Sequence, residues 1–194
     1  MSYKILLASM LSFGMAATAQ ARGLDISIGD EAAQLTYLYN SDGQIGIGGT
    51  DLGMGFFFNE NDDVVINGGI LVTGTSAGQN RALQMGVGVR AHVGKLDIPG
   101  EDDGVSAIAI GGKIAYILPS RMPLALSLEG YIAPEVTAFG DNKDLTELLA
   151  RFEIEIAPTT RFFVGFRNLE VEFEDSGLEY EIDDSGHLGI RFSF

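Results

Sequence analysis

The amino-acid sequence predicts an all-β protein, a single antiparallel transmembrane β-barrel of about ten strands that follows a cleaved signal peptide. Three observations support this fold class. Apolar and polar residues alternate along most of the chain beyond residue 22, which gives each strand one face for lipid and one for a polar interior. The composition is 46% hydrophobic, yet beyond the N-terminal stretch no apolar run has the roughly 20 residues that a membrane-spanning helix needs. Residues 187–194 alternate in the same way and end on an aromatic residue, Phe194.

The N-terminal stretch has the features of a secretory signal peptide. One basic residue, Lys4, precedes an apolar run over residues 5–17, and small residues follow up to Ala21. The apolar run is too short for a membrane anchor, and two Ala-x-Ala sites come after it. We therefore expect cleavage after Ala19 or Ala21, with residues 1–21 as the signal peptide and residues 22–194 as one barrel domain.

The first five candidate strands show the alternation between clusters of turn-forming residues. The fifth is the clearest, because apolar residues from Leu83 to Val93 alternate with glycines, Gln84, Arg90 and His92. Glycine is frequent inside these strands, which favours a small and strongly curved barrel. The five strands lie at residues 24–28, 35–39, 52–58, 66–72 and 83–93.

Five further candidate strands complete the count. The fourth of these begins with apolar residues at even positions from 162 to 166 and continues with apolar residues at odd positions from 169 to 173. A β-bulge near Arg167 and Asn168 would explain this change, or the strand leaves the membrane there. The five strands lie at residues 108–118, 124–132, 148–156, 162–173 and 187–194.

The connections between the strands indicate which way the barrel faces. Short turns are expected at residues 119–123 and 158–160, and longer acidic loops at 59–63, 95–104, 140–144 and 174–186. Outer-membrane barrels have short periplasmic turns and longer outer loops, so both termini should lie in the periplasm. The glycine-rich segment 41–51 is long for a periplasmic turn. If the first two strands were one bent element, the alternative would be a barrel of eight strands.

Charge and composition exclude several classes of function. The formal net charge is −15, which argues against nucleic-acid binding because phosphate recognition needs basic patches. The chain has no cysteine, so thiolate nucleophiles and zinc-thiolate sites are excluded. The segment Gly86-Val87-Gly88 is not a nucleotide-binding loop, because no helix follows it. We expect no cofactor.

Charged residues gather on the face of the strands that points into the barrel. Buried charges generally need partners, so we predict an ion-pair network that fills the bore. In this network Glu153 and Glu155 should lie close to Arg167 and Arg191. The alternative is a narrow polar pore lined by the same residues. The predicted network consists of Arg90, His92, Lys113, Glu129, Arg151, Glu153, Glu155, Arg167 and Arg191.

Neither catalysis nor metal binding has a specific signal. His187 lies at the start of the last candidate strand and follows Asp183, Asp184 and Ser185. These residues are the nearest match in the sequence to the catalytic residues of a hydrolase. Acidic residues are so common here that such a neighbour is expected by chance, and we expect no enzymatic activity. The acidic loop at residues 59–63 lacks the ligand spacing of a calcium loop, so we expect a solvated surface and no dedicated metal site.

Three stretches of the sequence resemble the YfaZ family of small outer-membrane proteins. They are Ala-Gln-Leu-Thr-Tyr-Leu-Tyr from Ala33, Phe-Phe-Asn-Glu-Asn-Asp-Asp from Phe57 and Met-Gly-Val-Gly-Val from Met85. The resemblance extends over essentially the whole predicted mature chain. It implies a single-chain barrel in the outer membrane, brings no catalytic residues with it, and implies that Phe194 is the signal by which the barrel-assembly machinery recognises the chain.

Together these features predict an integral protein of the cell outer membrane that is exported through the inner membrane. We expect a monomer that contacts outer-membrane lipid and lipopolysaccharide and has a structural or surface-interaction role. A narrow porin for small solutes is the alternative. An outer-membrane hydrolase is the second alternative.

Overall fold

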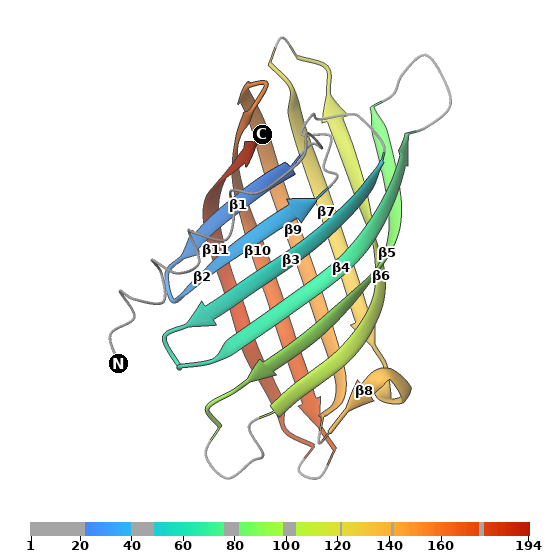
Figure 1. The fold of residues 1–194 in the computed structure, drawn as a ribbon, viewed down its shortest axis with the longest axis vertical. Coiled ribbons are helices and arrows are strands. Elements are labelled where there is room, and N and C mark those ends of the chain that lie inside the picture. The colour runs from blue at the N-terminus through green and yellow to red at the C-terminus, as the bar shows by residue number, and fades with distance from the viewer. Residues whose placement is uncertain are drawn as a thin grey trace.

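The computed structural model describes residues 22–39, 49–75, 82–98, 104–120, 122–140, 142–174 and 177–194, and they form one closed β-barrel (Figure 1). Ten long antiparallel strands make the wall, so the predicted fold class is confirmed and the alternative of eight strands is wrong. The predicted signal peptide lies outside the described residues. The strands are β1 Arg22–Gly29, β2 Ala32–Tyr39, β3 Thr50–Asn59, β4 Val64–Thr75, β5 Leu83–Lys95, β6 Gly104–Leu118, β7 Leu124–Ala133, β9 Asn142–Ala157, β10 Thr160–Phe173 and β11 Glu179–Ser193.

Each strand pairs with its neighbour in the chain, and β1 pairs with β11 to close the barrel. A short excursion between β7 and β9 contains the 3-10 turn η2 Glu135–Thr137 and the two-residue strand β8 Ala138–Phe139, which pairs with β6. Within the described ranges, no helix has the length and apolar character needed to cross a membrane.

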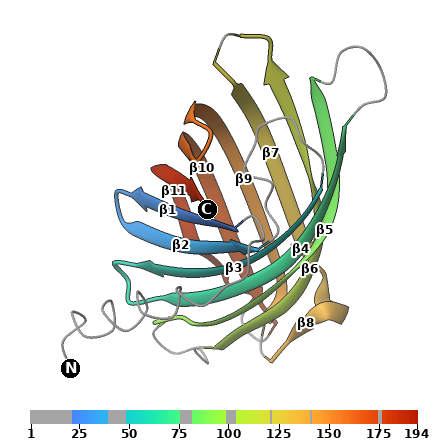
Figure 2. The same cartoon turned by 45° about the horizontal axis from the view of Figure 1, so that its top comes forward.

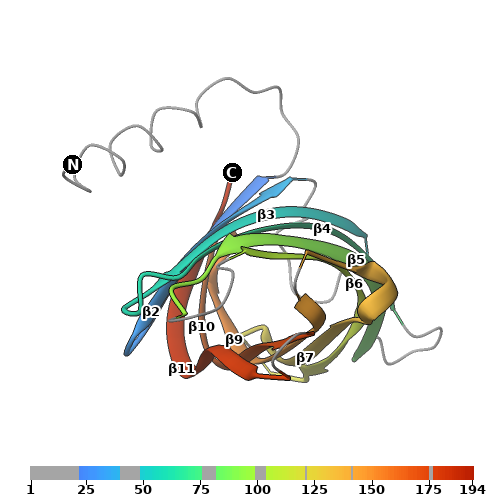
Figure 3. The same ribbon diagram turned by 90° about the horizontal axis from the view of Figure 1, so that it is seen from below.

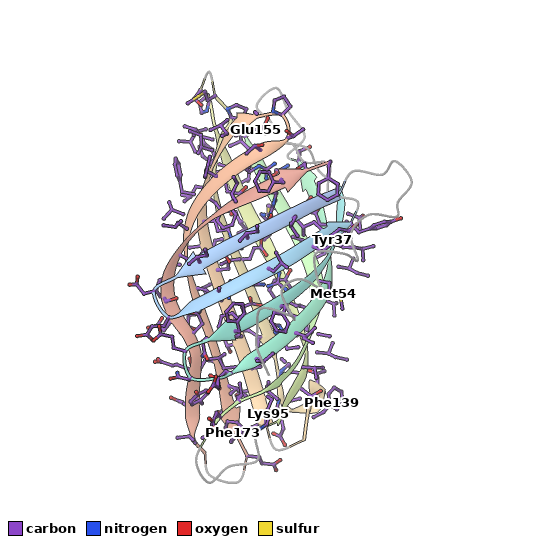
Figure 4. All side chains as sticks on the ribbon, turned by 60° about the vertical axis from the view of Figure 1, so that its left-hand side comes forward. Tyr37, Met54, Lys95, Phe139, Glu155 and Phe173 are labelled. Carbon is purple, nitrogen blue, oxygen red and sulfur yellow. The ribbon has the colours of Figure 1, made fainter. Side chains whose placement is uncertain are left out.

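The alternation of side chains gives the barrel an apolar outside. Outward-facing residues are exposed although they are large and apolar, as shown by Val87 at 72%, Leu188 at 67% and Met54 at 64% exposure (Figure 4). Their neighbours in sequence face inward and are more buried. Such a continuous apolar exterior is what a hydrocarbon environment favours and what a water-soluble surface avoids.

The two ends of the barrel differ. We call the end at which β1 begins and β11 finishes the terminal end, and the opposite end, which carries the β3–β4, β5–β6 and β10–β11 connections, the loop end (Figures 1 and 3). The β10–β11 connection is shorter than the predicted acidic loop at 174–186, because β11 already begins at Glu179. Strand pairing with β10 places residues 179–186 in the barrel wall.

Strand β10 keeps one alternation along its whole length, so the predicted change of facing is wrong. Phe166 is exposed on the outside, whereas Leu169, Val171 and Phe173 are buried inside. The apolar residues change faces because the interior itself becomes apolar toward the loop end. A bulge does exist, but it lies on the partner strand: Leu169 pairs with Asp183 and the next residue pairs with Glu181, which leaves Ile182 as the extra residue of β11.

The wall is uneven at the loop end. The pairing of β1 with β11 stops at Gly29 and His187, so residues 179–186 of β11 continue beyond the β1–β2 hairpin (Figure 2). The β3–β4 turn lies against this free part of β11, because Asn59 Nδ2 donates a hydrogen bond of 3.0 Å to the carbonyl oxygen of Ile182. This contact passes over the short β1–β2 hairpin and joins the two parts of the wall that extend beyond it, the β3–β4 turn and the free part of β11.

Candidate functional site

The interior of the barrel near the loop end is filled by apolar side chains. They come from β3, β4, β6, β7, β9, β10 and β11, and two of them, Leu96 and Ile98, come from the β5–β6 connection and fold inward. Leu96 is fully buried, so this connection contributes to the core and is not only an outer loop. The cluster, which we call the apolar plug, consists of Phe57, Val65, Leu96, Ile98, Val105, Ala107, Ala109, Tyr131, Ala133, Leu145, Leu169, Val171, Phe173 and Ile182.

A buried carboxylate joins the segments around the apolar plug. Asp63 is 0% exposed, and its oxygens accept hydrogen bonds from Asn59 Nδ2 at 2.8 Å, from the backbone N–H of Asp97 at 2.8 Å and from the hydroxyl of Tyr180 at 2.9 Å. These donors belong to the β3–β4 turn, the β5–β6 connection and β11. The prediction that residues 59–63 form a solvated surface is therefore wrong for Asp63.

The local sequence explains half of this arrangement. The side-chain oxygen of Asn59 accepts the backbone N–H groups of Asn61 and Asp63, both at 3.0 Å, which is the turn chemistry typical of asparagine. The contacts of Asp63 with Asp97 and Tyr180 depend on segments that are distant in sequence. Across the described residues, no group of three or more His, Cys, Asp or Glu side chains is arranged to hold a metal ion.

Below the plug lies a layer of ion pairs centred on Arg90. Its guanidinium is 2.7 Å from Glu147 and 3.2 Å from Glu129, and it lies over the ring of Tyr131 at 4.1 Å from the centroid. Lys113 Nζ is 3.1 Å from the other oxygen of Glu129. Two carboxylates thus hold two cations across β5, β6, β7 and β9, as buried charges require.

A second group of ion pairs lies toward the terminal end. Asp25 on β1 accepts hydrogen bonds from Arg191 on β11 and from Arg151 on β9, the latter at 3.2 Å. Arg161 Nη1 lies 2.9 Å from Glu153, which links β10 with β9, and Glu153 also interacts electrostatically with Arg191. All five side chains are largely buried.

The predicted network residues lie inside the barrel. The predicted proximity of Glu153 and Arg191 is confirmed by their electrostatic interaction, whereas Arg167 is paired with a residue that was not predicted. Glu153 pairs with Arg161, Arg191 pairs with Asp25, and Arg167 lies 3.4 Å from Asp183. His92 Nε2 lies 3.6 Å from Glu147, and Glu155 lies opposite Arg161 in the β9–β10 register. The alternation of charged residues could have identified Asp25, Glu147, Arg161 and Asp183 as inward-facing, but only the cross-barrel distances identify them as partners.

His187 does not form the constellation that its sequence neighbours suggest. It pairs with Gly165 on β10 and Gly29 on β1, which places it in the wall beside Phe163 at a ring distance of 6.1 Å. Ser185 Oγ donates its hydrogen bond to Asp183 at 2.6 Å. Among the described residues, no hydrogen bond reaches either ring nitrogen of His187.

Between the two groups of ion pairs lies a cavity of about 100 Å³. One wall consists of the charged side chains described above. The facing wall is neutral and polar, with Gln34 and Thr36 from β2, Asn67 from β4, and glycines at 53 and 69. Leu38 and Asp51, at the ends of β2 and β3 nearest the terminal end, also line the cavity.

Outside the barrel, beyond the apolar belt, the loop end of β9 to β11 carries acidic side chains. Glu170 pairs across the strands with Glu181, and Glu172 with Glu179. Desolvation and the carboxylates of Glu179 and Glu181 raise the pKa of Glu170 above its usual value. Lys143 Nζ lies 2.6 Å from Glu172, and this hydrogen bond lowers the pKa of Glu172. We call Glu170, Glu172, Glu179 and Glu181 the acidic ladder.

A closed antiparallel barrel with an apolar exterior and a charged interior defines a membrane-type β-barrel protein. The chain belongs to the YfaZ family, since the family model described as YfaZ precursor matches residues 2–194. The resemblance predicted from the sequence is thereby confirmed. A comparison with curated proteins found no match.

Proposed function

We propose that this protein is an integral outer-membrane β-barrel whose bore is closed, and that it acts as a structural or surface-interaction protein. The observation that carries this proposal is the apolar plug, in which Leu96 and Ile98 fold into the loop end of the barrel. Small barrels commonly fill their interiors with side chains, and a dry apolar segment opposes the passage of water and ions.

Placement in the outer membrane is supported by the apolar exterior and by the family, which is described as a precursor. Strands cross a bilayer only as a closed barrel, because every backbone group then has a partner. With the terminal end in the periplasm, the loop end and the acidic ladder would face the cell exterior, as the short-turn rule predicts. The partners are then outer-membrane lipid and lipopolysaccharide, with the barrel-assembly machinery acting during biogenesis, and the protein is a monomer.

The ion pairs below the plug suit a rigid structural role. Arg90 holds two carboxylates, from β7 and β9, and Asp25 holds two arginines, from β9 and β11. Networks of this kind fix one arrangement of the strands because breaking a single member leaves a buried charge without a partner.

Conductance in a planar bilayer tests the proposal. The refolded mature chain, shown to be folded by heat-modifiable migration on a detergent gel, should give no discrete conductance steps. Steps from the folded protein would overturn the closed bore. A purified mature chain that stays soluble without detergent would overturn the membrane location.

A narrow channel for small solutes is the second candidate, and the cavity of about 100 Å³ favours it. If the plug opens in the membrane, solutes would pass the ion pairs that surround this cavity. In that case Arg151→Ala or Glu153→Ala should change the size or ion preference of the steps. A silent bilayer for both the native chain and these variants would exclude this candidate.

A further inference from the structure

We propose that the interior cavity is a binding site for a small, uncharged, hydroxyl-bearing solute that reaches it from the terminal end. The inference concerns the cavity alone, and it depends on the proposed closed bore only for the direction of access. Three features of the cavity support it: the paired charges of one wall, the side-chain amides of the other, and the volume between them.

The charged wall is already neutralised by its own partners. Each of the four cations that line the cavity has a carboxylate within 3.2 Å, namely Glu129 or Glu147 for Arg90, Glu129 for Lys113, and Asp25 for Arg151 and Arg191. A charged ligand would have to break one of these buried pairs, which is costly. An uncharged ligand leaves the pairs intact.

The neutral wall offers more hydrogen-bonding capacity than the protein itself uses. Gln34 and Asn67, on either side of β3, both lie over Gly55: a methyl group added there would come within 2.7 Å of Gln34 Nε2 and 2.6 Å of Asn67 Oδ1. Gln34 donates to Thr36 at 3.0 Å. Within the part of the chain that the structure describes, the half-buried Asn67 amide makes no side-chain hydrogen bond.

Side-chain amides present a donor and an acceptor side by side, which matches adjacent hydroxyl groups of a polyol or sugar. Leu38, Leu71 and Leu149 also line the cavity and offer apolar contact to the carbon skeleton of such a ligand. The combination of side-chain amides, apolar contacts and neutralised charges favours this class over ions or purely apolar molecules.

The volume limits the size of the ligand. A cavity of about 100 Å³ is several times larger than the roughly 10–15 Å³ that a single water needs, so it has room for a small organic molecule. A polyol or sugar of four to five carbons is the size that we test. The apolar plug lies on the loop-end side, and the presence of Leu38 and Asp51 in the lining indicates that the cavity extends toward the terminal end.

Binding of erythritol and xylose to the folded native chain in detergent, measured by calorimetry or saturation-transfer NMR, tests the inference. Both should bind saturably, whereas xylonate, the anionic derivative of xylose, should bind at least about tenfold more weakly. Asn67→Ala should weaken binding of the neutral ligands by about tenfold, because it removes their hydrogen bonds to the amide. Gly55→Ala should abolish binding because the methyl group overlaps both amides.

Gly74→Ala is the matched control, because a methyl group added at that glycine of β4 meets nothing within 4 Å, and its binding should equal that of the native chain. Heat-modifiable migration verifies folding of every variant. If Gly55→Ala does not fold, the result with Asn67→Ala is the deciding one. The inference is overturned if neither neutral ligand binds saturably, if xylonate binds equally well, or if Asn67→Ala binds like the native chain. If the barrel is silent in bilayers and does not bind these ligands, only this inference is overturned. If the barrel binds them but gives conductance steps, only the closed bore is overturned.

Discussion

Arg191 on the last strand and Asp25 on the first strand face each other across the seam that closes the barrel. They are register partners in the β1–β11 pairing, and Arg191 donates two hydrogen bonds to the carboxylate of Asp25. Arg151 donates a third from β9. One buried carboxylate therefore joins the two ends of the wall to β9, the strand on the other side of β10.

Asp25→Asn should destabilise the folded barrel by about 3–5 kcal/mol, because it removes the carboxylate that is hydrogen-bonded to both buried arginines, Arg191 and Arg151. Urea titration of the detergent-folded protein, followed by gel migration, measures the change. Asp30→Asn is the matched control, since Asp30 is exposed in the β1–β2 turn and should shift the midpoint little. Equal midpoints for the two variants would mean that the seam does not need this pair.

Asp63→Asn should loosen the loop end, because a neutral amide accepts the Asp97 and Tyr180 hydrogen bonds less strongly than a carboxylate. The chain has no cysteine, so a single cysteine at Ala107, which is buried in the plug, reports access by its labelling rate with a membrane-impermeant thiol reagent. We expect labelling to be about tenfold faster with Asp63→Asn and less affected by Tyr180→Phe.

The neighbouring variant Asp62→Asn serves as the control for that experiment. Asp62 is exposed and has a positive φ of 62°, a conformation that asparagine also tolerates, so the change removes the same charge without touching the buried cluster. Labelling at the native rate with Asp63→Asn would show that the carboxylate does not hold the plug closed.

Acid should affect two residues of the acidic ladder in opposite directions. The pKa of Glu170 is raised in the folded protein, so this residue adds stability as the pH falls through its folded pKa above 4.5. The pKa of Glu172 is lowered, so its contribution is present at neutral pH and is lost as the pH falls below 4.5 toward the folded pKa. Glu170→Gln should therefore remove the gain in stability that acid brings. Glu172→Gln should remove the loss of stability. Unfolding midpoints between about pH 3 and 7 measure both, and equal pH profiles for the two variants would contradict the assignment.

Deletion of Phe194 should reduce the fraction of chain that assembles in the membrane, with little effect on barrels that have already folded. Phe194 is 65% exposed at the terminal end. It lies beyond Ser193, the last residue of β11 that pairs with β1, so its deletion breaks no strand pairing. Heat-modifiable protein in isolated membranes gives the assembled fraction, and Phe194→Tyr should retain it. Phe139→Ala, at an aromatic residue of similar exposure on β8, controls for the loss of surface area. Normal assembly without Phe194 would mean that it is not the recognition signal.

His187→Ala should leave lipid and peptide turnover by the folded barrel unchanged, because we expect no enzymatic activity and the Ser185 hydroxyl is engaged by Asp183. Turnover by the native chain that disappears in a folded His187→Ala variant would favour the hydrolase instead. A Ser185→Ala variant would then identify the nucleophile.

The period-two pattern predicts ten strands and the facing of most side chains, because alternation is a local property that each segment carries by itself. It also placed Arg90, Lys113, Glu129 and Arg151 inside the barrel, where the structure has them. It misjudged β10, since a pattern of apolar positions cannot tell an apolar exterior from an apolar interior.

By itself, the sequence determined the fold class, the apolar exterior and the charged face of the wall, and the structure decided for ten strands over eight. Only the tertiary structure decided that Arg191 pairs with Asp25, that Asp63 is buried under Tyr180, and that Asn67 and Gln34 meet over Gly55. The physical reason is that these contacts depend on the register between strands and on closure of the barrel. Register and closure bring together residues up to 166 positions apart, and no local pattern contains that information.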